Sequence, residues 1–357
     1  MQQTEGLQQA AWRRLKKNKS AVFGMIVIAL AIFVSLFAYL LAPDASANAN
    51  RMIVEIGGQK PGYQQTFLLL KKEEVQSTSF IKKIFSGQQE AFIYLPISSY
   101  NQKGDSVVVK KFIDEGLYEA QTYLLTAPIN ESIITKKFWL GTDKYGRDIL
   151  SRLLVGTRVS LSVGVIAVII SLSLGIVLGA LAGYFGKKTD AIIMWLINVV
   201  WSIPTLLLVF AITFLLGKGF WQVFVAVGLT MWVNVARIVR GQVLAVRELE
   251  YVEAARALGY THSRTIFRHI LPNIMGPVLV VAASNFASAI VIEAGLSFLG
   301  VGVQPPQPSW GLMIKENFNF IITHNPMLAL APGIAIMILV LAFNLLGNGL
   351  RDALNVK

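Results

Sequence analysis

Residues 248–273, ELEYVEAARALGYTHSRTIFRHILPN, have the residue types and spacing for binding another protein. This segment is the longest polar and basic stretch between apolar segments in the second half of the chain. Residues 252–258 are good helix formers, with Glu253 in the first turn and Arg256 later, which is the order that the helix dipole favours. The pattern therefore predicts a short helix at the start of this segment.

A second short helix is expected after Gly259. Gly259 can take the left-handed conformation that ends the first helix, and Thr261 or Ser263 can cap the second. Pro272 marks the end of the second helix or a kink in it. The first helix keeps one side thin enough for a close approach by another protein, through the small residues Ala254, Ala255 and Ala257. The alternative is an amphipathic surface helix without a partner.

The composition is that of a membrane protein that crosses the bilayer several times. The chain has 357 residues, of which 54% are hydrophobic and 15% charged, whereas soluble domains carry about 25% charged residues. The net charge is +12, but the basic residues stand beside apolar segments, which indicates orientation in a membrane and no binding of nucleic acid. The chain has no cysteine, so disulfides and thiol chemistry are excluded. Its three histidines do not suggest a metal site.

The N-terminal part predicts a first transmembrane helix. Residues 1–20 are polar and basic, and residues 21–42 are almost entirely apolar and long enough to cross a bilayer. The basic flank places the N-terminus in the cytoplasm. A signal peptide is the alternative, because Ala45-Ser46-Ala47 resembles a cleavage site. The apolar run is longer than the roughly 7–15 residues of a signal core, which favours a retained helix.

Residues 43–138 predict a small strand-rich extracytoplasmic insert between the first two membrane helices. Short apolar stretches alternate with charges and turn residues, with strands expected at 52–56, 66–70, 91–97 and 106–113 and an amphipathic helix at 79–85. The insert either contacts a binding protein or covers the membrane face.

Residues 139–158 predict an interfacial amphipathic segment. Thr142 or Asp143 can cap its helix and Gly146 permits a turn. Its charged residues, among them Arg147 and Asp148, suit the membrane surface, with the apolar face formed by Ile149, Leu153 and Leu154 on lipid. A specific gating role is the alternative.

Five further spans are expected, at 159–185, 191–216, 220–236, 274–301 and 327–347, with a cytoplasmic loop at 237–273 and a cytoplasmic C-terminus at 348–357. Pro204 should kink the third span. Small residues recur every fourth position in the second span and predict a close helix contact: Ser171, Gly175, Gly179 and Gly183.

The fifth span is the most polar. It contains Ser284, Asn285, Ser288 and Glu293, which are candidates for lining a translocation path. A carboxylate at membrane depth normally faces a cavity or a partner, so for Glu293 a structural hydrogen-bonding role is the alternative to a role in the path.

Three motifs resemble those of one family. Glu253-Ala254-Ala255, three residues, Gly259 and then Leu271-Pro272 resemble the EAA loop of ABC importer permeases. The string EAARALG…RHILPN is similar to the dipeptide, oligopeptide and nickel permeases. GTDKYGRD resembles the family signature before the second span, with Gly141, Thr142, Asp143, Gly146, Arg147 and Asp148, and residues 293–311 resemble the exit of the fifth span.

The resemblance covers 139–354 closely and 1–42 loosely. It implies the type I ABC importer permease fold, an all-α membrane protein with six transmembrane helices, to which the insert is foreign. It also implies that a separate ATPase docks on the EAA segment, formed by Glu253, Ala254, Ala255, Arg256, Ala257, Leu258 and Gly259. Two positions depart from the family, because relatives tend to have Arg at Trp195 and Asp at Asn198.

The same resemblance implies half of a translocation pathway in a bacterial inner membrane, with both termini cytoplasmic. The expected partners are a second homologous permease, two ABC ATPase subunits, an extracytoplasmic solute-binding protein and membrane lipid. Short peptides are the expected substrates, and nickel complexes or other small solutes stay open.

No catalytic residue, metal or cofactor is expected, because the sequence contains no clear nucleophile–base pair or metal-ligand cluster. Residues 186–189, GKKT, lack the leading glycine of a phosphate-binding loop. The alternative class is an ion-coupled secondary transporter, which would need inverted repeats and paired acidic residues at the membrane midplane. The sequence has one candidate carboxylate, Glu293, and no clear repeat.

Overall fold

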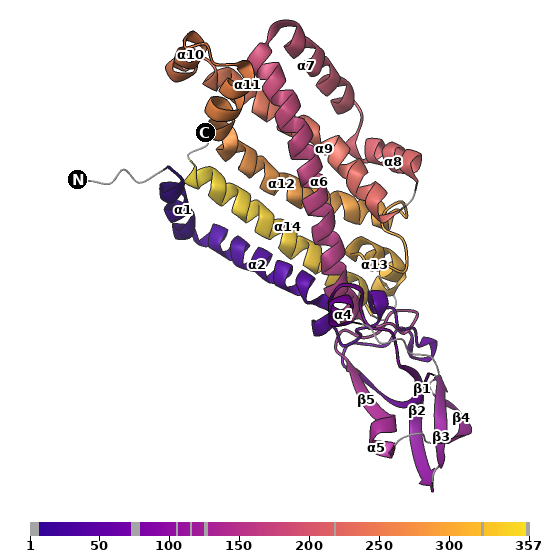
Figure 1. The fold of residues 1–357 in the computed structure, drawn as a ribbon. Coiled ribbons are helices and arrows are strands. Elements are labelled where there is room, and N and C mark those ends of the chain that lie inside the picture. Colours follow the sequence, from indigo (N-terminus) through magenta and orange to yellow (C-terminus); the bar gives the residue numbers. More distant parts are fainter. Residues whose placement is uncertain are drawn as a thin grey trace, which may run out of the picture. The chain divides into compact units, whose positions relative to one another are not determined.

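The computed structural model describes residues 7–72, 79–104, 106–114, 116–124, 128–217, 219–322 and 325–354, so His324 lies outside it. The chain divides into two compact units (Figure 1). Unit 1 comprises residues 1–31, 160–304 and 335–357, and unit 2 comprises residues 32–159 and 305–334.

Five helices are long and apolar enough to cross a membrane within the described residues. They are α2 (Lys19–Leu36), α6 (Ile149–Phe185), α9 (Phe220–Val246), the continuous run His262–Phe298 that contains α12 (Leu271–Phe298), and α14 (Met327–Ala353). The pair α7 (Lys187–Trp201) and α8 (Thr205–Leu216) makes a sixth span if the two helices are taken together. The predicted mostly helical, six-span fold agrees with this count.

Shorter helices connect these spans. They are α1 (Leu7–Lys17), α3 (Ala38–Leu41), α4 (Phe80–Ser86), α5 (Ile129–Ser132), α10 (Glu250–Ala257), α11 (His262–Thr265) and α13 (Trp310–Asn317). Single 3-10 turns lie at Ala47–Ala49, Val54–Ile56 and Phe318–Ile321, and a π-helical turn lies at Ile266–Ile270.

Several helix boundaries differ from those expected. The fourth span continues to Val246 and not to 236, because residues 237–246 contain only Gly241 as a weak helix breaker. The fifth span starts before 274, since Pro272 occupies the first turn of α12, where proline is tolerated. The sixth continues to Ala353. At Pro204 the helix does not merely kink, because α7 and α8 meet at 92°.

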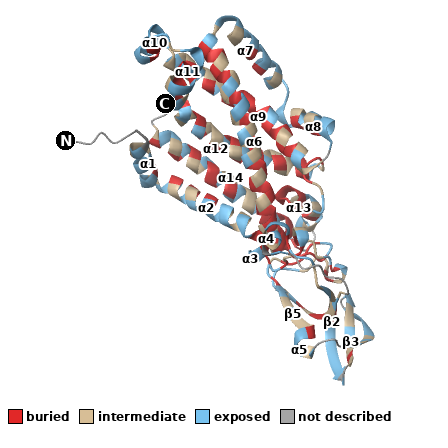
Figure 2. Cartoon of the chain, viewed as in Figure 1, coloured by how far each residue is buried: buried red, intermediate tan, exposed pale blue. Residues whose placement is uncertain are grey.

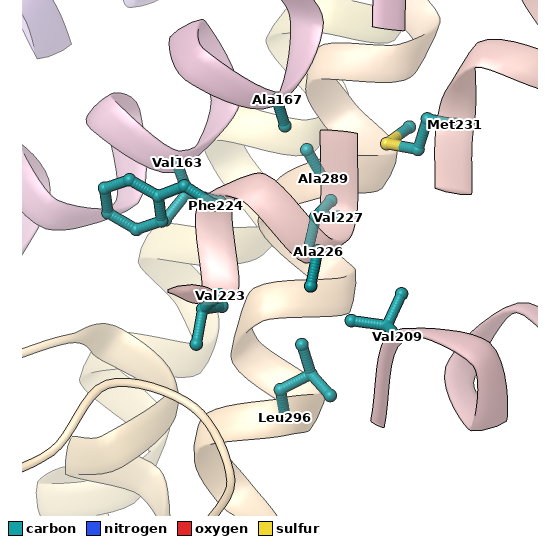
Figure 3. Packing of buried hydrophobic residues seen from close by; sticks show 10 residues of the cluster. All are labelled: Val163, Ala167, Val209, Val223, Phe224, Ala226, Val227, Met231, Ala289 and Leu296. Carbon is teal, nitrogen blue, oxygen red and sulfur yellow. The ribbon is translucent and has the colours of Figure 1, made fainter. Parts of the chain in front are cut away.

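Helix α9 is central to unit 1. In its most apolar part 67% of the residues are buried, against 11% for α2 (Figure 2). The ten buried residues shown in Figure 3 come from α6, α8, α9 and α12, and include Phe224, Val227 and Met231 of α9. The packing of these four helices therefore converges on α9.

Helix α6 contacts α9 through its stripe of small residues. A Cβ atom on Gly175 would lie 2.4 Å from Val235 Cβ, one on Gly179 2.5 Å from the carbonyl oxygen of Ala236, and one on Gly183 2.8 Å from that of Arg240. Real Cβ atoms do not approach so closely, so only glycine permits this separation of the two helices. We call this contact the glycine seam.

The insert contains an antiparallel five-stranded sheet of order β4-β3-β2-β1-β5. Its strands are β1 (Tyr63–Lys71), β2 (Phe92–Lys103), β3 (Ser106–Asp114), β4 (Leu117–Leu124) and β5 (Ile133–Phe138). Three expected strands correspond to β1, β2 and β3, and the helix expected at 79–85 corresponds to α4. The strand expected at 52–56 is wrong, because residues 54–56 form a 3-10 turn whose Ile56 is buried beside Phe67 and Phe138.

The predicted interfacial helix at 139–158 is only partly present. Helix α6 begins at Ile149, which is fully buried and does not lie on lipid, and Arg147 and Arg152 are each 1% exposed. Both arginines pair with carboxylates within unit 2. Arg147 Nε donates to Asp143 Oδ2 at 2.6 Å, and Glu316 Oε2 accepts from Arg147 Nη2 at 2.7 Å and from Arg152 Nη2 at 3.2 Å. Paired charges can be buried where single ones cannot. The position of this segment at the membrane surface stays a prediction.

The remaining signature residues lie in the same loop before α6. Gly141 and Gly146 have φ angles of +81° and +71°, and a Cβ on Gly146 would lie 1.7 Å from the carbonyl oxygen of Ile53. The Thr142 hydroxyl accepts from Gln59 N at 3.0 Å, and Asp148 Oδ2 accepts from Ser151 N at 2.9 Å. Gly141, Thr142 and Gly146 thus hold the loop before α6 against residues 53–60, and Asp148 bonds to the first turn of α6.

A charged cluster surrounds Tyr94 of β2. The Arg51 guanidinium lies 3.9 Å from the centroid of the Tyr94 ring, and Lys136 Nζ lies 4.6 Å from it. Burial and the positive charge of Arg51 lower the pKa of Lys136 from 10.5 to about 8, although Asp44, Asp148 and Glu90 act in the opposite direction. Burial raises the pKa of Asp148.

The glycine seam predicts that two glycine-to-alanine changes differ in their effect on the stability of the protein. Gly179→Ala forces α6 and α9 apart and should cost roughly 1–3 kcal/mol. Gly241→Ala adds a Cβ that meets nothing within 4 Å, so it should leave stability unchanged or raise it by up to about 1 kcal/mol. Thermal unfolding in detergent compares the two. Equal shifts of the unfolding temperature in the two variants would contradict the close contact of α6 and α9 at the glycine seam.

The buried charges predict a large effect of Glu316→Gln. Removing this carboxylate leaves two buried arginines short of a partner and should cost about 3–5 kcal/mol. Lys315→Gln at the neighbouring exposed position should have little effect. Resistance of the purified protein to limited proteolysis, followed with increasing denaturant, tests this. If both variants resist proteolysis like the wild type, the pairing of Glu316 with the two buried arginines does not stabilise the protein.

The lowered pKa of Lys136 predicts that the insert becomes more stable with rising pH. Between about 8 and 10.5 the unfolded chain holds a proton that the folded chain does not, so the free energy of unfolding rises with pH across this window. Lys136→Met should lack this rise. Hydrogen exchange of the β5 amides, corrected for intrinsic rates, measures it. The same pH dependence in both proteins would refute the assignment.

Candidate functional site

The segment 250–265 forms a helical elbow in unit 1, made of α10, the turn at Gly259 and α11. Gly259 has a φ angle of +76°, and its N–H donates to the Arg256 carbonyl at 2.9 Å. Tyr260 N donates to Ala255 O at 3.1 Å, which completes the glycine end of α10. Thr261 caps α11, since its Oγ1 accepts from Arg264 N at 3.4 Å. Both predicted helices and the predicted turn are therefore present.

The elbow and the turn that follows it expose apolar side chains. Leu258 is 74% exposed, and Phe267, two residues after α11, is 67% exposed. Among the seven residues of the EAA segment, Ala255 faces inward beside the buried Val252, and the other six are exposed: Glu253, Ala254, Arg256, Ala257, Leu258 and Gly259. Exposed apolar side chains on a charged segment are typical of a surface that another protein covers.

The elbow is attached to the ends of the membrane helices. Tyr184 OH, at the end of α6, lies 2.9 Å from His262 Nδ1, and the Arg256 guanidinium lies 4.9 Å from the centroid of the Tyr184 ring. Val252 packs into one buried cluster with residues of α9 and α12, including Val243 and Ile274. No sequence motif marks Tyr184, which stands in an apolar run.

Unit 1 also contains a cavity of about 430 Å³ between α7, α8, α9, α12 and α14. Of the four residues predicted for a translocation path, Asn285 and Ser288 line this cavity. Ser284 and Glu293 are not among its lining residues. Glu293 is buried and accepts from the Ser297 hydroxyl at 2.6 Å, and the same hydroxyl accepts from Val303 N at 3.0 Å. The geometry of Glu293 favours the hydrogen-bonding alternative.

Sequence reasoning assigned no role to four other cavity residues, Asn234, Asn344, Thr230 and Trp201. An asparagine within an apolar helix is the sequence feature that could identify such residues. Its amide is costly to place in a bilayer unless it faces a cavity or a partner. Asn234 and Asn344 both meet this description.

The two positions that depart from the family lie on α7. Trp195 is exposed, and Asn198 Oδ1 accepts from Arg237 Nη2 at 3.5 Å. The Arg237 guanidinium also lies 3.5 Å from the centroid of the Trp201 ring. Arg237 is thus held beside the cavity by an aromatic face and an uncharged amide.

Two family models match the chain. Residues 175–357 match the binding-protein-dependent transport system inner membrane component, and residues 6–60 match the N-terminal transmembrane domain of oligopeptide transport permease C. The first match covers the elbow, the cavity and most of unit 1.

Curated relatives match over about two thirds of the chain. The glutathione transport system permease protein GsiD of Pectobacterium atrosepticum is 42% identical over 240 residues, which are 67% of this chain and 79% of that protein. The oligopeptide transport system permease protein OppC of Bacillus subtilis is 42% identical over 62% of this chain and 73% of that protein. The di/tripeptide permease DppC of Pseudomonas aeruginosa is 42% identical over 66% and 77%, respectively.

Among solved structures, the inward-facing MetNI methionine ABC transporter is similar over 57% of this chain and 96% of that chain, with 20% identity and a TM-score of 0.47. The family models and the extent of identity to curated relatives decide the assignment. The chain belongs to the family of binding-protein-dependent transport system inner membrane components, the membrane-embedded subunits of ABC importers.

Proposed function

We propose that this importer permease carries short peptides, and that separate ATPase subunits drive it through the elbow. The observation that carries the proposal is that the exposed elbow is attached to the same helices that line the cavity. The chain itself serves transport and not catalysis, and we assign ATP hydrolysis to the partner chains.

Helices α9 and α12 connect the elbow to the cavity. Asn234 of α9 precedes the helix end at Val246 by about 18 Å, and Asn285 of α12 follows its start at Leu271 by about 21 Å, from the 1.5 Å rise per residue. A partner that displaces the elbow would move Tyr184 and the ends of both helices with it. Continuous helices would pass such a displacement to the cavity wall.

The substrate class rests on the named relatives, which carry glutathione, oligopeptides and dipeptides or tripeptides. All of these solutes are short peptides. The cavity volume of about 430 Å³ falls within the range of about 300–1,000 Å³ that is common for small-molecule sites.

The multi-pass chain lies in the inner membrane, and we propose that the elbow and both termini are cytoplasmic. Basic residues flank the elbow side of the spans, among them Lys187, Lys188 and Arg247, which is the side that the positive-inside rule assigns to the cytoplasm. The proposed assembly contains a second homologous permease, two ATPases and an extracytoplasmic solute-binding protein.

Leu258→Asp should weaken ATPase association by at least about tenfold, because it places a charge in the middle of the covered apolar surface. Uptake by the reconstituted importer should fall with it. The matched control is Leu124→Asp in β4, since Leu124 is 78% exposed and Leu258 74% exposed. Co-purification of the ATPase and uptake assays measure both variants.

The fold should tolerate both substitutions, because both side chains already face solvent. If Leu258→Asp retains ATPase association and uptake to the same extent as Leu124→Asp, the elbow is not the docking site.

A further inference from the structure

The cavity wall combines apolar side chains with uncharged amides and hydroxyls. The amides come from three helices, with Asn234 on α9, Asn285 on α12 and Asn344 on α14. The hydroxyls of Thr230 and Ser288 stand beside them. None of the described residues that line the cavity is Asp, Glu, Lys, Arg or His. The lining side chains thus carry no charge, and the Arg237 guanidinium lies outside the lining, against the ring of Trp201.

Two of the three amides are free to bind a solute. The Asn285 amide is buried and lies 3.5 Å from Ser171 Oγ, so it is partly engaged within the protein. Asn234 and Asn344 are exposed, and within the described part of the chain no hydrogen bond involves their side chains. Each amide offers an acceptor oxygen and two N–H donors, which is the complement of a peptide bond.

We infer that this wall recognises the main chain of a passing peptide through its amides and does not select the charge of the peptide's side chains. The inference rests on the proposed function and specifies its substrate class. Neutral hydrogen bonds hold a solute weakly enough for release, which conduction requires. A fixed charge in a partly desolvated cavity would instead retain one sign of substrate and repel the other.

The same wall does not suit a free metal cation. Nickel ions are typically held by imidazole, carboxylate or thiolate groups, and the described lining residues include none of these. The lining therefore favours peptides over a free nickel ion, and a nickel complex with an organic ligand stays open.

The experiment adds a charge to the wall. The complete importer, with its partner permease, ATPases and binding protein, is reconstituted in proteoliposomes, and initial ATP-driven uptake of trialanine, trilysine and triglutamate is measured. The variants are Asn234→Asp and Asn344→Asp. The control is Asn348→Asp, an exposed asparagine one turn further along α14 that does not line the cavity. The binding protein is the same in every sample, so its own preference cancels when each variant is divided by the wild type.

We expect each cavity aspartate to raise the ratio of trilysine to triglutamate uptake roughly tenfold over the wild type, because the new carboxylate attracts one peptide and repels the other. Asn348→Asp should leave the ratio unchanged. Asn234→Ala should slow all three peptides to the same extent, since it removes a main-chain contact and adds no charge.

Two results would overturn the inference. One is an unchanged ratio in both cavity variants, and the other is ATP-driven uptake of free Ni²⁺ by the wild-type importer. Failure of the proposed function looks different, because the wild-type assembly would then move none of the three peptides.

Discussion

The close approach of α6 and α9 at the glycine seam is the constraint on which the arrangement of unit 1 depends. Lipid tails are as apolar as leucine, so two helices in a bilayer gain little from the hydrophobic effect and must instead fit each other closely. Gly175, Gly179 and Gly183 provide that fit, since a Cβ on any of them would collide with Val235, Ala236 or Arg240. The seam fixes α9 at the centre of unit 1 (Figure 2).

Both candidate sites follow from the position of α9. Asn234, in the middle of this helix, lines the cavity, and Val243, near its end, packs against Val252 of the elbow. The seam also brings the end of α6 to the elbow, where Tyr184 contacts His262 and Arg256. The proposed docking surface and the cavity wall are thus joined by continuous helix, and we propose this helix as the route that couples ATP hydrolysis to transport.

The sequence was sufficient where the determining contacts are local. The glycine turn, the helix cap and the small residues of the elbow all lie within 26 consecutive positions. The apolar spans and the glycine stripe can be recognised because their residues recur at regular spacing. The contacts of the loop before α6 are only partly local. Arg147 pairs with Asp143 four residues away, but also with Glu316, 169 residues away, which pairs with Arg152 as well, and no spacing rule predicts this distant partner. When Glu316 is not considered, the two arginines and two aspartates have the pattern of a segment that lies at a membrane surface.

The same reasoning explains the other errors. The cavity depends on single amides of three helices that are remote in sequence, so only Asn285 and Ser288, on the visibly polar fifth span, were found. Strand β4 was not expected because its residues are mostly exposed and mix charged with apolar side chains. Strand β5 contains two lysines and depends on its pairing with β1.

The central claim is that the elbow faces the cytoplasm and is covered there by an ATPase. The chain has no cysteine, so Leu258→Cys introduces its one thiol, and a membrane-impermeant maleimide reports which side of the membrane that thiol faces. The account predicts labelling in inside-out vesicles stripped of the ATPase, protection when the ATPase is added back, and no labelling in sealed right-side-out vesicles. Labelling from the outside, or labelling that the ATPase does not reduce, would contradict it.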